Sequence, residues 1–543
     1  MKFLFITLYD HIATGCRELM GFLTMRGHQC TLVHFKSHAG KHQTPRGQEL
    51  EPSEVPGMEY GSLRRILPLG DSYHPFPKLV TQREIDLLCD IIAEERPALI
   101  GFTLLSSFIH VAKKVSPAIK ERFPDIPLAW GGIHAMFMPE ESLRYADIAC
   151  VGEGERALEE FAADPSRTDI KNLWFKKDGQ IIRNERRPLE QDLDSLHFHC
   201  IGHTREVLIE DGEARELTMQ SDPDFFRYNY YVSTQRGCAF KCSYCTHGVM
   251  RDWRVGGGAY LRRHSPEWML RQLEKDNARL KLDFLHFMDD VFLLDPKWVR
   301  EFLDGYKKRI GVPFWCYIYP VHNVHEMLEW GRDAGLVCVN IGIQSGSEFI
   351  KQKIFDRHYT NEAMKAMCWR CRELGIQMHY DILCNNPYED ECHLRETVEF
   401  LLELPKADII HTFPLCDFPG LRINTLNYPR YDLPGELRLF YSLMYQLTRH
   451  PDVSDQVIRE LCGNEHYKRN PEELGRLIHI LMKPILYEEG SKENSHAGLM
   501  SATPRPPAAP SLAGRARRKL GQIAREAVRA ARSIGSRGGN GSA

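Results

Sequence analysis

Three closely spaced cysteines are the residues of this sequence with the most specific chemistry. Cys238, Cys242 and Cys245 follow a Cys-x3-Cys-x2-Cys spacing in one short segment. Three thiolates satisfy three irons of a cubane cluster and leave the fourth iron open, as a catalytic rather than a structural metal site requires. The alternatives are a zinc site with His247 as fourth ligand, or cysteines that only pack in the core. The aromatic residue directly before the third cysteine favours the cluster.

With Tyr244 before Cys245, the segment resembles the Cys-x3-Cys-x-aromatic-Cys motif of the radical S-adenosylmethionine (SAM) enzymes. The resemblance implies a [4Fe-4S] cluster on Cys238, Cys242 and Cys245 whose open iron chelates SAM. It also implies that reduction cleaves SAM to methionine and a 5′-deoxyadenosyl radical, with Tyr244 packed near the adenine. No catalytic residue is assigned beyond the cluster and the SAM site.

Two further segments resemble SAM-binding motifs of the same family. Asp289 and Asp290 stand at a strand end where the family binds the SAM amino group, and a helix N-cap by one of them is the alternative reading. The segment from Gln344 to Glu348 resembles a Glu-Ser-Gly-Ser motif in which Gln344 replaces the glutamate. The candidate SAM contacts are therefore Tyr244, Asp289, Asp290, Gln344, Ser345 and Glu348.

Glycine-rich strand ends in the N-terminal part resemble the cobalamin-binding half of cobalamin-dependent radical SAM proteins. Glycines there let the backbone approach a flat macrocycle or its nucleotide tail closely, and the alternative is a Rossmann-type domain without a ligand. The Asp-x-His-x-x-Gly motif of many cobalamin domains is not matched, because Asp10 and His11 are adjacent, so His11 is not assigned to cobalt. The candidate cobalamin contacts are Thr103, Ser106, Gly131, Gly132, His134, Gly152, Glu153 and Gly154.

Alternating apolar runs and helical patterns predict an α/β chain that positions these residues. Residues 1–165 predict a doubly wound, flavodoxin-like parallel sheet, and residues 231–420 predict a partial (β/α)6 barrel. Ligands bind at the carboxyl ends of such strands, where the glycines and cysteines fall. The predicted strands are 2–8, 30–34, 98–104, 128–130 and 147–151, then 232–234, 284–288, 314–318, 337–343, 378–383 and 409–415.

The remaining segments are expected to have supporting roles. The polar residues 166–230 suggest an irregular connector, and residues 421–495 predict a small helical region. Residues 496–543 predict a basic tail, either disordered or an amphipathic helix with weak affinity for a membrane surface. Histidines in the barrel strands, His286, His379 and His411, are expected to be structural, with proton transfer by His379 or His411 as the alternative.

The formal charge of −3 is unevenly distributed. Residues 501–543 carry nine Lys or Arg and one Asp or Glu, a net +8 that leaves −11 for the rest. A near balance of charge argues against a dedicated nucleic-acid coat protein where the charge is evenly spread, and no nucleic-acid partner is expected. No run of about 18 apolar residues predicts a membrane span, and the apolar start is interrupted too early for a signal peptide, so a cytoplasmic protein is expected.

The resemblances together imply a cobalamin-dependent radical SAM enzyme with a [4Fe-4S] cluster, SAM and cobalamin as cofactors. The expected reaction is methylation of an unactivated carbon through a 5′-deoxyadenosyl radical and methylcobalamin. One alternative is an oxidative cyclase or rearrangement enzyme without methyl transfer, and another is a cobalamin-binding sensor with an inactive barrel. The expected partners are a small-molecule or lipid-like substrate and an electron donor such as flavodoxin or ferredoxin.

Overall fold

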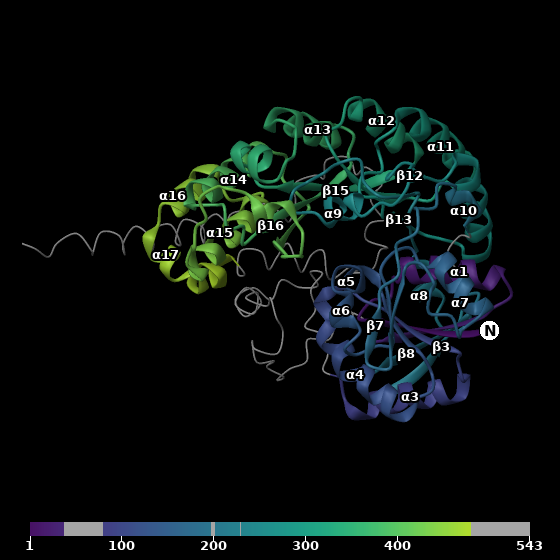
Figure 1. The fold of residues 1–543 in the computed structure, drawn as a ribbon. Coiled ribbons are helices and arrows are strands. Elements are labelled where there is room, and N and C mark those ends of the chain that lie inside the picture. Colours follow the sequence, from purple (N-terminus) through teal and green to yellow (C-terminus); the bar gives the residue numbers. More distant parts are fainter. Residues whose placement is uncertain (37–79, 197–200, 229, 479–543) are drawn as a thin grey trace, which may run out of the picture.

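The computed structural model describes residues 1–36, 80–196, 201–228 and 230–478. These residues form an N-terminal α/β unit, a partial barrel and a C-terminal group of helices (Figure 1). The α/β class, the parallel sheets and the helical C-terminal region are confirmed. The basic tail predicted over 496–543 lies outside the described residues.

The N-terminal sheet is parallel at its centre, in the order β5-β4-β3-β1-β2. Alternate residues of β1 enter different cores: Leu4 and Ile6 pack with α3 and α4, whereas Phe3 and Phe5 pack with α1 and α7. Helices therefore cover both faces, as a doubly wound sheet requires. The elements are β1 (Lys2–Leu8), α1 (Thr14–Met25), β2 (Gln29–Phe35), α3 (Gln82–Glu95), β3 (Leu99–Thr103), α4 (Ile109–Arg122), β4 (Leu128–Gly131), α5 (Gly132–Phe137), α6 (Pro139–Ser142), β5 (Ile148–Cys150) and α7 (Glu155–Ala163).

The segment 166–230, expected to be an irregular connector, instead extends this sheet at both edges. It adds β6 (Leu173–Lys177) and β7 (Gln180–Ile182) beside β5, and β8 (Arg205–Glu210) and β9 (Glu213–Leu217) beside β2. Over the described residues, the resulting sheet has nine strands. These strands are short, and the exposed residues of β7 and β9 resemble the composition of a loop. The helix α8 (Pro223–Tyr228) follows them.

The barrel sheet has six parallel strands in chain order, β10-β13-β14-β15-β16-β17. Figure 1 shows α11, α12 and α13 along the outer side of this sheet, with the N-terminal unit on the opposite side. The elements are β10 (Tyr231–Val232), α10 (Pro266–Leu280), β13 (Leu285–Phe287), α11 (Pro296–Arg309), β14 (Phe314–Ile318), α12 (Val324–Ala334), β15 (Leu336–Gln344), α13 (Asn361–Glu373), β16 (Gln377–Cys384), α14 (Glu391–Glu403) and β17 (Ile409–Pro414).

A separate two-stranded antiparallel sheet carries the cysteine segment. It consists of β11 (Gln235–Arg236) and β12 (Arg262–Arg263), and α9 (Thr246–Asp252) follows the cysteines. After the barrel, α15 (Gly435–Thr448), α16 (Asp455–Cys462) and α17 (Glu465–Arg469) pack into the same core as the barrel helices. In the described part of the chain, no helix is both long enough and apolar enough to cross a bilayer.

Candidate functional site

The three cysteines lie on one tight loop between β11 and α9. All three are partly exposed, whereas most other cysteines of the described chain are buried. The loop turns back on itself because the Cys245 amide donates to the Cys242 carbonyl at 3.1 Å and the Gly248 amide donates to Cys245 at 3.0 Å. Gly237, just before Cys238, has a φ of 86°, and a Cβ there would collide with the Tyr260 carbonyl. Only glycine allows this entry into the loop.

Backbone contacts hold the loop against the barrel. The Ser243 amide donates to the Phe355 carbonyl at 3.0 Å, and the Ser243 hydroxyl donates to the Ile354 carbonyl. The Arg251 guanidinium donates to the carbonyls of Cys238 and Phe240. None of these contacts uses a thiol, so all three sulfur atoms remain available as ligands.

The geometry favours a cluster over a mononuclear zinc site. Both ring nitrogens of His247 are engaged, Nδ1 with the Tyr260 hydroxyl at 2.6 Å and Nε2 with Asp290 Oδ2 at 2.9 Å. Among the described residues, no group of three His, Cys, Asp or Glu side chains is arranged to hold a single metal ion. A cubane places each thiolate on a different iron, so its three protein ligands need not converge on one ion.

Burial makes the thiols of Cys238 and Cys245 weak acids in the metal-free chain. Burial, followed by the charge of Asp290, raises the pKa of Cys238 to about 12. Burial also raises the pKa of Cys245 to about 11. Both thiols therefore hold their protons at neutral pH, and cluster assembly must release them.

Tyr244 and the buried side chain of Arg357 are hydrogen-bonded beside the cysteine loop. The Tyr244 hydroxyl accepts from Arg357 Nη1 at 2.8 Å, and the Tyr244 ring stands edge-on to Phe355. Arg357 is 6% exposed, and its Nη2 donates to the Gly342 carbonyl at 2.8 Å. Its Nε is buried and has no acceptor among the described residues. A buried cation with an unused donor suits an anionic ligand group.

Gln344 ends β15, and its side chain lies near Gly342, as does that of Arg357. The backbone of Gln344 is strained. Its φ is 65°, and a register shift interrupts β15 between Gly342 and Gln344. A Cβ on Gly342 would lie 2.6 Å from Gln344 Nε2, so the amide folds over that glycine. Gln344 Oε1 is buried, and no described residue donates to it. Strain together with an unsatisfied buried acceptor is typical of a ligand site.

The paired aspartates have separate roles. Asp289 is buried and accepts from the Thr234 amide and hydroxyl, both at 2.7 Å, and from the Gln235 amide at 2.9 Å. It thus anchors the strand that leads to the cysteine loop, although burial raises its pKa to about 6. Asp290 is exposed and pairs with His247 beside the loop. Neither caps α11, because Asp295 is the N-cap of that helix.

The other two SAM candidates point into protein networks. The Ser345 hydroxyl donates to Glu389 Oε1 at 2.9 Å, within a buried group that includes Thr397. Glu348 accepts from the Asn361 amide at 2.5 Å at the start of α13. The structure therefore brings Tyr244, Gln344 and Asp290 to the cysteine loop and places Ser345 and Glu348 away from it.

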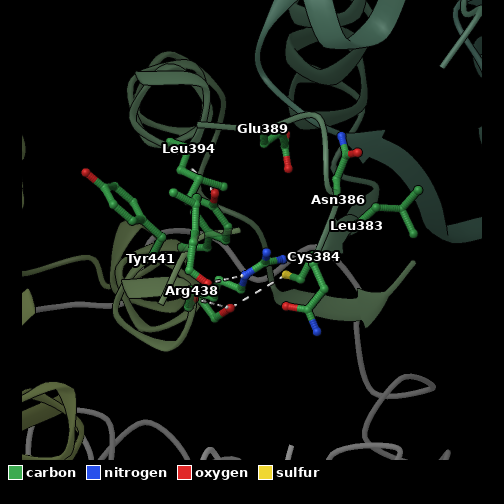
Figure 2. Close-up of a pocket in the computed structure, with 11 residues that line it drawn as sticks. Leu383, Cys384, Asn386, Glu389, Leu394, Arg438 and Tyr441 are labelled. Carbon is green, nitrogen blue, oxygen red and sulfur yellow. Dashed lines mark hydrogen bonds between the residues drawn. The ribbon is translucent and has the colours of Figure 1, made fainter. Parts of the chain in front are cut away.

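Glu389 lines a small pocket between the end of β16 and α15. Figure 2 shows Glu389 and Asn386 on one side of this pocket and Arg438 and Tyr441 on the other. Glu389 is 2% exposed, and burial raises its pKa to about 8. Asn386 Nδ2 is also buried and has no acceptor among the described residues. The pocket therefore holds a carboxyl group that is mainly protonated at neutral pH.

Replacing Glu389 by glutamine should stabilise the protein at alkaline pH. The folded-state pKa of about 8 exceeds the ordinary 4.5, so the stability linked to this proton is complete below pH 4.5 and is lost as pH rises through 8. We expect Glu389→Gln to be close to the parent at pH 5 and to exceed its free energy of unfolding by roughly 5 kcal/mol at pH 9. Denaturant titrations at both pH values measure this difference. Equal losses in parent and variant between pH 5 and 9 would contradict it, and the exposed Glu301→Gln is the control.

At the N-terminal unit, several cobalamin candidates meet at the carboxyl ends of β3 and β4. Ser106 Oγ lies 3.0 Å from His134 Nδ1, and Thr103 ends β3 beside them. His134 Nε2 is buried and lies 3.4 Å from Glu141 Oε2, and burial lowers the pKa of this ring although Glu141 opposes the shift. A neutral imidazole between a hydroxyl and a carboxylate at this edge fits a polar ligand such as the side chains or tail of a corrinoid.

The glycines at this edge of the sheet are Gly131, Gly132, Gly152 and Gly154, here called the glycine edge. The packing of the protein itself explains why some of these positions require glycine. Gly132 has a φ of 84°, and a Cβ there would lie 2.7 Å from the Leu104 amide nitrogen. A Cβ on Gly152 would lie 2.6 Å from the Asn172 side chain. Gly131 and Gly154 have ordinary clearance. Close backbone approach is therefore needed here even without a ligand.

The Gly152–Glu155 segment also joins the two units through an interdomain ion-pair network. Arg236 of β11 donates to Glu18 at 2.8 Å and to Glu155 at 2.5 Å. Arg262 of β12 donates to Glu153 at 2.7 Å. Burial opposes ionisation of Glu155, but the charge of Arg236 holds the pKa of Glu155 below its ordinary value. For Glu18, burial outweighs the charge of Arg236, so the pKa of Glu18 is raised. Glu153 thus bonds to the barrel unit rather than facing the glycine edge.

Sequence reasoning did not identify Arg236 or Arg357. A single arginine produces no periodic pattern, and its partners, Glu18, Glu155, Tyr244 and Gly342, are distant in the chain. The position of Arg236, two residues before the first cysteine, was the one available signal.

Two family models match the chain. Residues 232–401 match the model of the radical SAM superfamily, and residues 80–162 match the model of the B12 binding domain. The first match contains the cysteine loop, Arg357 and Gln344. The second contains the glycine edge and the Gly152–Glu155 segment.

Two curated relatives are similar to more than half of the chain. The anaerobic magnesium-protoporphyrin IX monomethyl ester cyclase of Cereibacter sphaeroides is 23% identical over 354 residues, which are 60% of this chain and 52% of that protein. The cobalamin-dependent radical SAM methyltransferase TokK of Streptomyces tokunonensis is 21% identical over 328 residues, which are 58% of this chain and 46% of that protein. The chain thus spans about half the length of these relatives.

A solved structure has the same fold. The radical SAM methyltransferase TsrM of Kitasatospora setae, with cobalamin and a [4Fe-4S] cluster bound, matches with a TM-score of 0.58 at 16% identity. The match covers 88% of this chain and 99% of that chain.

Proposed function

Because this chain belongs to the cobalamin-dependent radical SAM proteins, we propose that it methylates an unactivated carbon of a small molecule. Its cofactors are a [4Fe-4S] cluster, SAM and cobalamin. The observation that carries the proposal is the direct attachment of the cysteine loop to the B12-binding unit through Arg236. In the proposed reaction, this attachment keeps the SAM site close to the glycine edge. The methyltransferase TokK, a relative of this chain, supports methyl transfer as the outcome.

The residues of this chain have distinct tasks in the proposed reaction. When bound, the cofactors supply an electron from the cluster, a radical from SAM and a methyl group carried by cobalamin. Cys238, Cys242 and Cys245 hold the cluster. Arg357 and Gln344 would orient SAM beside the cluster, and Tyr244 would pack against SAM. We further propose that a carrier such as flavodoxin or ferredoxin supplies the electron.

A second candidate is oxidative cyclisation without methyl transfer. It is favoured by the Cereibacter sphaeroides cyclase, whose identity to this chain is similar to that of TokK. Both candidates need the same cofactors and the same cysteine loop. They differ in whether a carbon of the product gains a methyl group.

Anaerobic reconstitution with cobalamin and methyl-labelled SAM tests the proposal. Label that appears in a product of a cell extract, together with 5′-deoxyadenosine, supports methylation. Formation of 5′-deoxyadenosine without a labelled product supports the second candidate. Reduced, cluster-loaded protein that forms no 5′-deoxyadenosine would instead indicate a cobalamin-binding sensor.

Replacing Arg357 by glutamine should weaken SAM binding. The proposed partner of this guanidinium is the SAM carboxylate, and a charge-assisted hydrogen bond contributes about 1.5–3 kcal/mol. We therefore expect the Kd for SAM to rise roughly 10- to 100-fold, as measured by equilibrium dialysis against cluster-loaded protein. Arg357→Lys, which keeps the charge, should recover part of the affinity. An unchanged Kd in the glutamine variant would assign Arg357 to structure alone.

A further inference from the structure

The barrel sheet has a polar inner face that the proposed cofactors do not account for. Phe287, Cys316, Ile341 and Tyr380 pack with the outer helices in the main core. Because successive strand residues point to opposite faces, the residues between them face the other way. The polar and aromatic residues at these inner positions of the described strands are His286, Trp315, Tyr317, Asn340, His379, Asp381, His411 and Phe413, with Cys338 and Gly342 beside them.

A continuous chain of hydrogen bonds crosses this face from β14 to β17. Trp315 Nε1 donates to Asn340 Oδ1 at 2.8 Å, and Asn340 Nδ2 lies 3.2 and 3.3 Å from the two Asp381 oxygens. His411 Nδ1 lies 2.8 Å from Asp381 Oδ1. Asp381 is 8% exposed, so its carboxylate is largely shielded from water. These contacts hold it in one orientation.

The position of Asp381 relates it to the SAM site. In the strand register it is paired with Gly342 on one side and His411 on the other. Gly342 is the residue whose carbonyl Arg357 holds, two positions before Gln344. Neighbouring strands lie about 4.8 Å apart. Asp381 is therefore one strand away from the groups proposed to orient SAM, which is where the reacting substrate must lie.

The charge of this face points to one class of ligand group. Asp381 supplies a carboxylate, and the inner positions of the barrel strands contain no Lys or Arg. A carboxylate has about four acceptor sites, and Asn340 and His411 do not exhaust them. Trp315 and Tyr317, whose ring centroids are 4.7 Å apart, add aromatic surface that favours a cation.

We propose that the inner face of β14–β17 recognises the substrate, and that Asp381 binds a protonated amine of a small, water-soluble molecule. This inference rests on the proposed function and specifies its substrate class. It replaces the lipid-like substrate among the expectations from sequence. Asn340 and His411 are positioning residues that hold the Asp381 carboxylate.

A binding experiment tests this recognition independently of methyl transfer. Phenethylamine and phenylacetate are matched aromatic probes of opposite charge, and their binding to cluster- and cobalamin-loaded protein can be followed by ligand-observed NMR. We expect phenethylamine to bind at least tenfold more tightly, and Asp381→Asn to abolish this preference. The control Met378→Leu changes an outward-facing residue of the same strand and should leave the preference unchanged. Equal binding of both probes, or an unaltered preference in Asp381→Asn, would overturn the proposal.

A labelling experiment then separates the two proposals. With methyl-labelled SAM, we expect label in the fraction of an aqueous cell extract that a cation exchanger retains, with at least a tenfold loss in Asp381→Asn. Label confined to the lipid extract would overturn the amine assignment while leaving methylation intact. If 5′-deoxyadenosine forms without any labelled product, methylation fails, and the probe-binding result alone decides the role of Asp381.

Discussion

Replacing Cys242 by alanine will abolish formation of 5′-deoxyadenosine from SAM. The loop is held by backbone contacts of Ser243 and by Arg251, so it should keep its shape while the cluster loses one of three ligands. We expect the rate to fall roughly a thousandfold or more, about 4 kcal/mol of activation free energy. Iron content should fall from about four atoms per chain to below one. Anaerobic reconstitution followed by iron analysis and chromatography of 5′-deoxyadenosine measures both quantities.

A matched control comes from another cysteine of the chain. Cys392 is exposed at the start of α14 and outside the loop, so Cys392→Ala should retain full iron content and activity. A Cys242→Ala protein that keeps four irons would show that the cluster is held elsewhere. Circular dichroism of both variants distinguishes loss of a ligand from loss of the fold.

Replacing Arg236 by glutamine will separate SAM cleavage from methyl transfer. Arg236 and its partners Glu18 and Glu155 are at most about one-fifth exposed, at 21%, 20% and 9% for the side chains. Removing one partner of such a network leaves uncompensated buried charge, which costs about 3 kcal/mol or more. We expect the interface to loosen, so that the ratio of 5′-deoxyadenosine to methylated product rises at least tenfold. Methyl-labelled SAM reports both products in one assay.

Hydrogen exchange measures whether the interface between the two units loosens. Hydrogen exchange of residues 236–245 and 152–155 should accelerate in Arg236→Gln and stay unchanged in the exposed control Arg300→Gln. In the double variant Arg236→Gln with Glu155→Gln, part of the protection should return, because a carboxylate without its partner is removed. If exchange and product ratio both match the parent, the network does not hold the two units together.

The sequence was sufficient for the elements that carry strong apolar patterns. The central N-terminal strands and all six barrel strands lie close to their predicted positions, because parallel strands buried on both faces are nearly continuous apolar runs. The edge strands β6 to β9 were not predicted. Strands such as Glu213–Leu217, which is mostly exposed, have no apolar run to reveal them.

The candidate site also contains features that the sequence predicts and features that it does not. The cysteine loop was evident because its spacing is local in the sequence. The partners of Asp289, namely the Thr234 amide and hydroxyl and the Gln235 amide, depend on the pairing of β10 with β13. Likewise, Asn340, Asp381 and His411 become neighbours only through strand register. Contacts between distant segments leave no spacing that a single sequence can display.

The interdomain ion-pair network limits how this chain can be divided into fragments. Its carboxylates, from Glu18, Glu153 and Glu155, all precede residue 166, whereas Arg236 and Arg262 come later. A fragment that ends between them keeps three neighbouring acidic groups and loses both guanidinium groups. The N-terminal unit also leaves the ribosome first, with these carboxylates repelling one another until the barrel strands are made. Cobalamin affinities measured on that fragment alone would therefore describe a unit under electrostatic strain that the whole chain relieves.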